Sequence, residues 1–272
     1  MKRMYIFLSI MILSTALLKA QETKSNSFGM NLGMGNLQKQ DLIFSPFIIK
    51  DWSPLNILLD YEHSGKVDQK VSLRFGQSFF FVGEPFSYYY RDIELEKWAH
   101  STSNLDLNYS LTKSLVEKNN WKISAGGRYR NRFQITDYAF GEAGQFSYNL
   151  SYGLDALLNV EYKSGKHSFD SEFALPLFSF LARSPYTAQD DAYLERIMVH
   201  GGLKIFANHL KSATFQSWRT SKMVDLNLSY KYALNEKWDL GITYFFAMNR
   251  HNTPVPYTSI QNIIYLGTTL KF

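Results

Sequence analysis

The side chains that could support catalysis in this sequence are its six histidines and the hydroxyl residues near them. A histidine that removes a proton from a serine hydroxyl must share a strand face with it, and on a β-strand this requires a spacing of two residues. His63 is followed directly by Ser64, and His167 directly by Ser168. Each pair would point to opposite faces of a strand, so neither predicts a nucleophilic serine.

Three other histidines are weak catalytic candidates. His100 has a threonine, Thr102, at the spacing of two. His200 and His209 share a segment with the acidic pair Asp190-Asp191, and an Asp–His couple beside carboxylates could activate water for hydrolysis. The spacing of these residues matches no motif, and a site needs a geometric constellation. The pattern therefore favours a non-enzymatic protein, with His100, His200 and His209 as the residues to inspect.

Composition gives no reason to expect a cofactor, a metal or a nucleic-acid partner. The chain has no cysteine, which excludes thiolate metal sites and thiol nucleophiles. It contains no P-loop, dinucleotide-binding glycine pattern, HExxH or EF-hand spacing. The formal charge of +5 falls to +2 when Lys2, Arg3 and Lys19 are left out, because 26 basic residues then face 24 acidic ones. A nearly neutral protein is not expected to bind nucleic acid.

Apolar and polar residues alternate in many segments, which predicts β-strands with two different surroundings. The clearest run is 146–162, whose apolar face includes Leu150, and a second run places Leu226 on the apolar face. Aromatic residues make up 16% of the chain, which suits an outer wall in contact with lipid. This alternating pattern predicts ten strands, and two further strands in 28–36 and 197–206 would give the alternative number of twelve. The ten predicted strands are 40–50, 54–63, 66–78, 102–113, 121–133, 146–163, 167–178, 222–233, 238–250 and 258–272.

The polar faces carry full charges at strand centres. A soluble β-sandwich would also alternate, but it would turn this face to water, whereas a small closed barrel turns it to a lumen in which charges pair. The mixture of signs argues against a wide pore that selects one sign of ion. The predicted lumen ion-pair network consists of Asp106, Arg128, Arg130, Asp155, Glu161, Asp170, Glu172, Asp225 and Lys231.

The segment from Ile260 to Phe272 alternates in strict register and ends on an aromatic residue. In this it resembles the closing strand of Gram-negative outer-membrane β-barrels. The resemblance implies that Phe272 belongs to the signal read by the barrel-insertion machinery. It also implies an antiparallel transmembrane β-barrel with a side-chain-filled lumen, and it assigns no specific family.

The first twenty residues predict export. Lys2 and Arg3 precede the apolar run 4–18, and Ala20 offers a small residue for cleavage, which is typical of a secretory signal peptide. The alternative is an N-terminal membrane anchor, for which this run is short of the roughly 20 apolar residues that a span needs. We therefore predict a signal peptide over 1–20, cleaved after Ala20, and one barrel domain over 21–272 in the cell outer membrane.

Short polar connections near 63–66, 117–120, 163–166 and 234–237 predict periplasmic turns, because long loops of such barrels face outside. Three long loops are expected at 77–102, 134–145 and 177–220. The aromatic residues of 77–102 either continue the strands past the membrane or form a platform for a ligand, and 187–198 could hold a short helix. The predicted function is a non-enzymatic surface-binding or accessory barrel, with a lipid- or peptide-modifying enzyme and a small passive channel as alternatives. Outer-membrane lipid, the insertion machinery and another outer-membrane protein are the expected partners.

Overall fold

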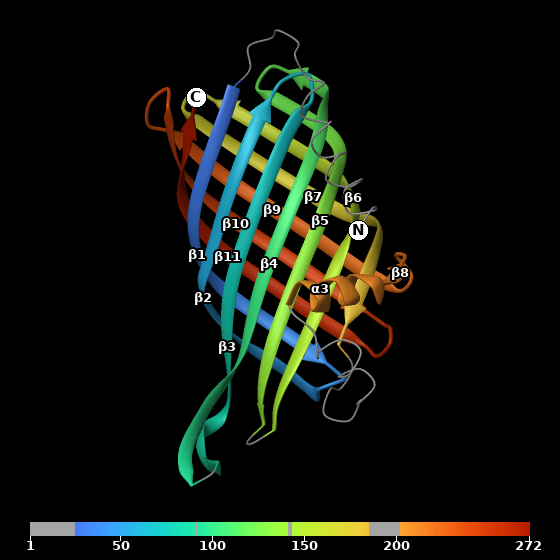
Figure 1. Cartoon of the computed structure of the whole chain (residues 1–272). Helices are drawn as coiled ribbons and strands as arrows, with labels where there is room; N and C mark the ends of the chain where they lie inside the picture. Colours follow the sequence, from blue (N-terminus) through green and yellow to red (C-terminus); the bar gives the residue numbers. More distant parts are fainter. Residues whose placement is uncertain (1–24, 91, 141–142, 185–201) are drawn as a thin grey trace.

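The computed structural model describes residues 25–272 except 91, 141–142 and 185–201, and within these ranges it is a closed antiparallel β-barrel (Figure 1). Ten strands form the ring, in the order β1 to β7, β9, β10 and β11, and β11 pairs with β1 to close it. The described elements are β1 (Ser25–Asp41), β2 (Ser45–Ser64), β3 (Asp68–Tyr90), β4 (Ile93–Lys118), β5 (Trp121–Phe140), β6 (Ala143–Ser164), β7 (His167–Arg183), α3 (Gly202–Lys211), β8 (Thr214–Gln216), β9 (Ser221–Ala233), β10 (Trp238–His251) and β11 (Tyr257–Lys271).

The predicted number of ten barrel strands is confirmed, but two of the assignments are wrong. The first strand covers the segment 28–36, which was expected only as an extra strand, and the segment 40–50 spans the turn between β1 and β2. This turn is tight, because the Phe44 amide donates to the Asp41 carbonyl and the Ile43 amide donates to the Asp41 carboxylate. The segment 197–206 forms no strand where it is described, since its residues from Gly202 onward belong to α3.

Glycine explains why β1 was hard to recognise. Its outward positions from Phe28 to Met34 are apolar, but Gly29, Gly33 and Gly35 occupy inward positions. Gly33 lies against the buried ring of Tyr265, and a Cβ at Gly33 would come within 2.5 Å of that ring. A larger residue would not fit there, so the glycine positions between 29 and 35 lack the polar side chains that would have marked the lumen face of this part of the strand.

The two ends of the barrel have different connections. The turns 65–67, 119–120, 165–166 and 234–237 lie at the end that also carries Asn26 and Phe272, the upper end in Figure 1, which we call the near end. Asn119 and Gly165 have φ angles of 55° and 58° in these turns, a conformation that glycine and asparagine tolerate best. At the opposite end, the far end, β3 and β4 form a hairpin that projects beyond the other strands (Figure 1).

The segments expected as loops at 77–102 and 134–145 are therefore largely strand. β3 and β4 stay paired up to Tyr90 and Ile93, and β5 and β6 stay paired up to Phe140 and Ala143. For 77–102 this agrees with the expected continuation of the strands. The helix predicted for 187–198 lies outside the described residues.

Outward and inward faces alternate as the pattern predicted. Leu228 and Ile242 are each 43% exposed on the outer wall, while Asp225, three residues before Leu228 on β9, is 1% exposed in the lumen. Register shifts interrupt the alternation beside Pro54 and Pro176, where the missing N–H of proline suits a bulge. None of the helices in the described part of the chain is long and apolar enough to cross a membrane.

One part of the outer wall is covered by the chain itself. The amphipathic helix α3 lies across the outside of β5 and β6 (Figure 1), with Leu210 and Ala213 packed against Tyr148 and Leu150. β8 then pairs with β7 through residues 179–181. Leu150 is consequently only 3% exposed. It lies on the outer face as expected, but its neighbours are protein side chains, which corrects the view that it faces lipid.

Candidate functional site

Three arginines on one face of β5 dominate the lumen. Arg128, Arg130 and Arg132 are separated by two residues each, so the strand period places all of them on the inner face. They are 3%, 1% and 6% exposed. Three guanidinium groups inside a barrel require partners, because an unpaired buried charge is costly.

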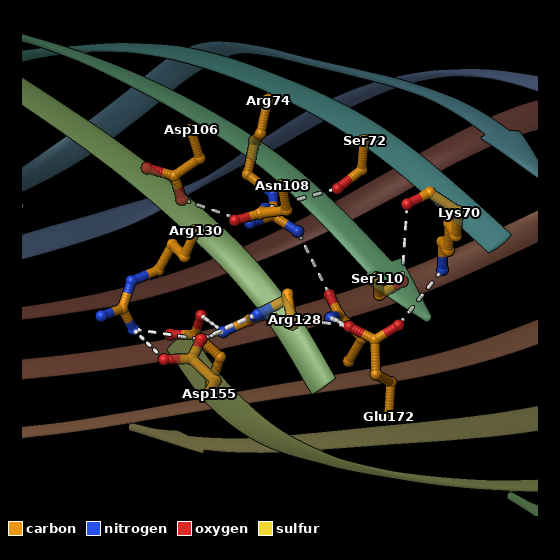
Figure 2. Close-up of polar contacts among 12 residues, drawn as sticks. Lys70, Ser72, Arg74, Asp106, Asn108, Ser110, Arg128, Arg130, Asp155 and Glu172 are labelled. Carbon is orange, nitrogen blue, oxygen red and sulfur yellow. Dashed lines mark hydrogen bonds and ion pairs between the residues drawn. The ribbon is translucent and has the colours of Figure 1, made fainter. Parts of the chain in front are cut away.

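Arg128 is held by carboxylates from three strands. Its Nη2 donates to Asp155 Oδ2 of β6 at 2.7 Å and to Asp225 Oδ2 of β9 at 2.5 Å. Its Nη1 lies 3.8 Å from Glu172 Oε1 of β7. Asp155 is the neighbour of Arg128 in the β5–β6 register, whereas Asp225 comes from a strand that does not pair with β5. Figure 2 shows Arg128 between Asp155 and Glu172.

Arg132, like Arg128, forms ion pairs that bridge strands on opposite sides of the lumen. It binds Asp106 of β4 in a bidentate manner, with Nε to Oδ1 at 3.0 Å and Nη2 to Oδ2 at 2.9 Å. The same Nη2 lies 3.2 Å from Asp225 Oδ2, and Nη1 donates to Asn249 Oδ1 at 2.8 Å. Arg130 lies between the two and pairs with Asp155 at 3.2 Å. Planar bidentate pairs of this kind are the geometrically most specific ion pairs.

Arg74 joins this charged region to an apolar side of the lumen. Its Nη1 lies 3.4 Å from Asp106 Oδ2, and its guanidinium carbon lies 3.5 Å from the centre of the Phe245 ring. The apolar side consists of Leu58, Phe245, Ala247, Ile263 and Tyr265. A guanidinium stacked on a ring can be buried more readily than an ammonium. We use the name lumen cluster for Arg74, Asp106, Arg128, Arg130, Arg132, Asp155, Glu172 and Asp225.

The lumen cluster fills the barrel at mid-height. A cavity of about 400 Å³ lies on its near side, bounded by Arg74, Arg128 and Glu172 and reaching the turns at Gly165 and Ala233. We call this cavity the vestibule. A second cavity, beside Arg74 and Asp106, measures about 10 Å³, which is room for a single water. Together these side chains block the passage from the vestibule to the far end.

The vestibule is polar and carries charges of both signs. Lys70 pairs with Glu172 at 3.3 Å, as Figure 2 shows, and Lys122 pairs with Asp68 at 2.6 Å. Lys271 pairs with Asp239 at 2.7 Å nearer the mouth. Because its cations alternate with carboxylates, the vestibule offers no strong field of one sign to an entering ion.

The structure divides the residues expected in the lumen network into two groups. Asp106, Arg128, Arg130, Asp155, Glu172 and Asp225 come together in the lumen cluster. Glu161, Asp170 and Lys231 line the vestibule instead, and Glu161 pairs with the exposed Lys163. Arg132 was missed by the sequence reasoning, although its spacing of two from Arg130 on the same strand was a sufficient signal.

A further polar group closes the lumen at the far end. Arg183 Nη2 lies 2.8 Å from Asp41 Oδ1, and its guanidinium faces the Tyr257 ring at 5.1 Å. Lys39 is 2% exposed and donates to Thr136 Oγ1 at 2.5 Å, between the rings of Tyr138 and Tyr257. These contacts join β1, β5, β7 and β11, so the far half of the lumen is also filled by side chains.

The histidine candidates do not form a common site where they are described. His100 is 2% exposed in the lumen, and its ring packs edge-on against that of Tyr138, with 5.4 Å between the ring centres. His209 belongs to α3, on the outside of the wall, and His200 lies outside the described residues. His100 and His209 are thus separated by the barrel wall.

A different serine–histidine pair is present that the sequence pattern did not reveal. Ser221 Oγ and His251 Nδ1 are 2.8 Å apart, because these residues are register partners on β9 and β10. Both are 2% exposed, and neither lines the vestibule or the smaller cavity. A nucleophile needs room for a substrate beside its hydroxyl. We therefore interpret the Ser221–His251 contact as a structural hydrogen bond. Separately, the described part of the chain contains no group of three or more His, Asp or Glu arranged to hold a metal ion.

Comparison with known proteins finds structural neighbours, but no protein family model and no curated protein sequence matches the chain. It is similar to the outer membrane protease OmpT from Escherichia coli, at 7% identity over 93% of this chain and 99% of that one, with a TM-score of 0.49. It is also similar to Neisserial surface protein A, at 10% identity over 90% of this chain and 97% of that one, with a TM-score of 0.35. The translocator domain of the autotransporter NalP from Neisseria meningitidis is similar at 8% identity over 99% of this chain and 96% of that one, with a TM-score of 0.40. These structural neighbours are Gram-negative outer-membrane β-barrels, and no specific family is assigned by them.

Proposed function

We propose that the chain is an outer-membrane β-barrel that is closed to free diffusion and acts as a non-enzymatic surface-binding or accessory protein. The observation that carries this proposal is the lumen cluster, in which Arg128 and Arg132 reach Asp225 across the barrel. When paired charges occupy the interior of a barrel, its exposed surfaces are the parts that remain available to bind a partner. Passive transport and lumenal catalysis both need space that these side chains occupy.

The outer wall supports the location. On β10, outward residues are apolar from Trp238 to Met248. At about 3.3 Å per residue and a tilt of about 40°, these ten steps rise roughly 25 Å, the height of the apolar band of outer-membrane barrels. Exposed Trp238 and Phe272 border this band at the near end, where interfacial aromatic residues are expected. We assign the near end, with its short turns, to the periplasm.

The β3–β4 hairpin is the element that we assign to surface binding. A tilted strand crosses a membrane with roughly 9 to 11 residues, whereas β3 has 23 and β4 has 26. The additional residues extend the hairpin past the far rim, and Tyr89 and Ile93 near its tip are 66% and 61% exposed. An exposed aromatic side chain beside an exposed aliphatic one on a paired hairpin suits contact with another protein.

The test is site-specific photo-crosslinking in intact cells. A photoreactive amino acid in place of Tyr89 should give a discrete protein adduct, because this position is exposed at the tip. The same amino acid in place of Ile242, which is 43% exposed at mid-wall, is the matched control and should give no protein adduct. Absence of an adduct at position 89 would count against surface binding by this hairpin.

Conductance tests the closed lumen separately. Purified protein in planar bilayers should show no stepwise ion current, since the lumen cluster blocks the passage. Regular single-channel currents from the unmodified protein would favour the passive channel instead. The hydrolase alternative retains one observation, the Ser221–His251 hydrogen bond, but the burial of both residues counts against it.

A further inference from the structure

Two cations face each other on the outside of the barrel, near its far end. Lys222 of β9 and Arg250 of β10 are register partners. Both are exposed, while their sequence neighbours Ser221 and Asn249 point into the lumen. Side chains directly opposite on neighbouring strands have Cβ atoms about 4.5–5.5 Å apart, and like charges at such positions are destabilising.

No carboxylate compensates this repulsion in the described part of the chain. Neither Lys222 nor Arg250 takes part in an ion pair there, although carboxylates neutralise the buried arginines throughout the lumen. The next residues along the same rung are neutral, since Arg250 is the partner of Thr258, which in turn is the partner of Gln40. The basic pair is therefore available to an anion from outside.

The height of the pair indicates which anion it meets. The next outward-facing rung toward the near end consists of Val224, Met248 and Ile260, and these residues form the far edge of the apolar band. The exposed side chain of Trp218 and that of Arg219 stand just before β9. Lys222 and Arg250 lie one rung beyond this edge, at the level where lipid headgroups begin.

We propose that Lys222 and Arg250 form a binding site for the phosphate of a lipid headgroup in the leaflet at the far end of the barrel. Arginine presents a planar fork that suits phosphate oxygens, and lysine adds a mobile point charge. The acyl chains of the same lipid would lie on Val224, Met248 and Ile260. Free phosphate offers the charge alone, whereas the lipid uses both the charged rung and the apolar rung. This inference rests on the membrane placement proposed above.

Native mass spectrometry of the detergent-purified barrel tests the site. The probes are phosphatidic acid, phosphatidylcholine and inorganic phosphate, each added at the same concentration. The unmodified protein should retain phosphatidic acid and should retain the other two at least roughly tenfold less. In the double variant Lys222→Gln/Arg250→Gln, retention of phosphatidic acid should fall to the level of phosphatidylcholine. Equal retention of phosphatidic acid by the double variant and the unmodified protein would overturn the proposal.

Two further variants separate this site from general attraction and from misfolding. Lys113→Gln removes one exposed lysine of β4 near the opposite end of the wall and should leave the retention of phosphatidic acid unchanged. Arg250→Glu places a carboxylate opposite Lys222, so the protein should melt at a higher temperature in neutral detergent and yet lose phosphatidic acid. A loss of lipid with Lys113→Gln as large as that of the double variant, or phosphate retention that matches the lipid, would also overturn it. Insertion of the unmodified protein into lipid vesicles is measured separately, and a failure to insert would contradict the proposed function, not the lipid site.

Discussion

Asn26 and Phe272 exchange both of their backbone hydrogen bonds, each at 2.8 Å. This pair lies at the near end of the β1–β11 ladder and completes the contact that closes the ring. The Phe272 side chain is 65% exposed on the outer wall, in line with Leu270 and Leu266. The backbone of Phe272 thus belongs to the fold, while its ring is free to be recognised from outside.

Replacing Phe272 by Ala should separate these two roles. The backbone bonds to Asn26 remain, so refolding into detergent should be nearly unchanged. If the ring is part of the assembly signal, the amount of barrel in the outer membrane of cells should fall, with precursor left to proteolysis. Quantitative immunoblotting of membrane fractions measures this. Lys271→Ala, which removes a half-exposed pair with Asp239, is the control, and equal outer-membrane levels for all three proteins would refute the assignment.

Asp225→Ala should be the most disruptive change in the lumen. This carboxylate is 1% exposed and pairs with Arg128 and Arg132. Its removal leaves two buried guanidinium groups with one partner fewer each, and breaking such a pair costs about 3–5 kcal/mol. Urea titration in lipid vesicles, followed by tryptophan fluorescence, measures the free energy of unfolding, and ion leakage through the variant should rise.

Glu161→Gln is the matched control for that prediction. Glu161 pairs with Lys163, whose side chain is 67% exposed, and an exposed pair contributes at most about 1 kcal/mol. A loss of stability for Glu161→Gln as large as that for Asp225→Ala would show that burial of the lumen cluster does not determine its importance.

Leu228→Arg tests the assignment of the outer face. Leu228 is 43% exposed on β9, about midway between Lys222 and the near end. An arginine at the bilayer midplane of a barrel wall costs about 2–4 kcal/mol. Leu228→Ile should be close to neutral in the same vesicle titration. A neutral arginine at this position would mean that the strand does not face lipid.

Leu150→Ala should act on the helix that covers it. Leu150 packs against Leu210 of α3, and removing a buried leucine side chain typically costs about 2–5 kcal/mol. We expect limited proteolysis to cut the variant faster within 202–211 than the unmodified protein, while the barrel stays intact. Unchanged cleavage would indicate that α3 is held by other contacts.

Epitope tags test the orientation. A tag at Asp92, in the turn of the β3–β4 hairpin, should react with antibody on intact cells. Tags at Gly165 and Asn235, both in near-end turns, should react only after permeabilisation. Labelling of the Gly165 tag on unbroken cells would reverse the assignment of the two ends.

The sequence by itself determined the local features of this protein. The alternation of side chains along a strand is a property of neighbouring residues, so it indicated that Arg128, Arg130 and Asp225 share the polar face and that Leu228 lies on the apolar one. Turn residues such as Asn119 and Gly165 likewise marked short connections, because their backbone preferences are local.

Only the tertiary structure decided which of these side chains meet. Arg128 reaches Asp225 across the lumen because the ring closes with a particular stagger of its strands, and no period in the sequence encodes that stagger. The same holds for Ser221 and His251, which register brings together, and for Leu150, whose outward direction was predictable but whose cover by α3 was not. The turn at 41–44 was mistaken for a strand because alternation by itself does not show where a chain reverses.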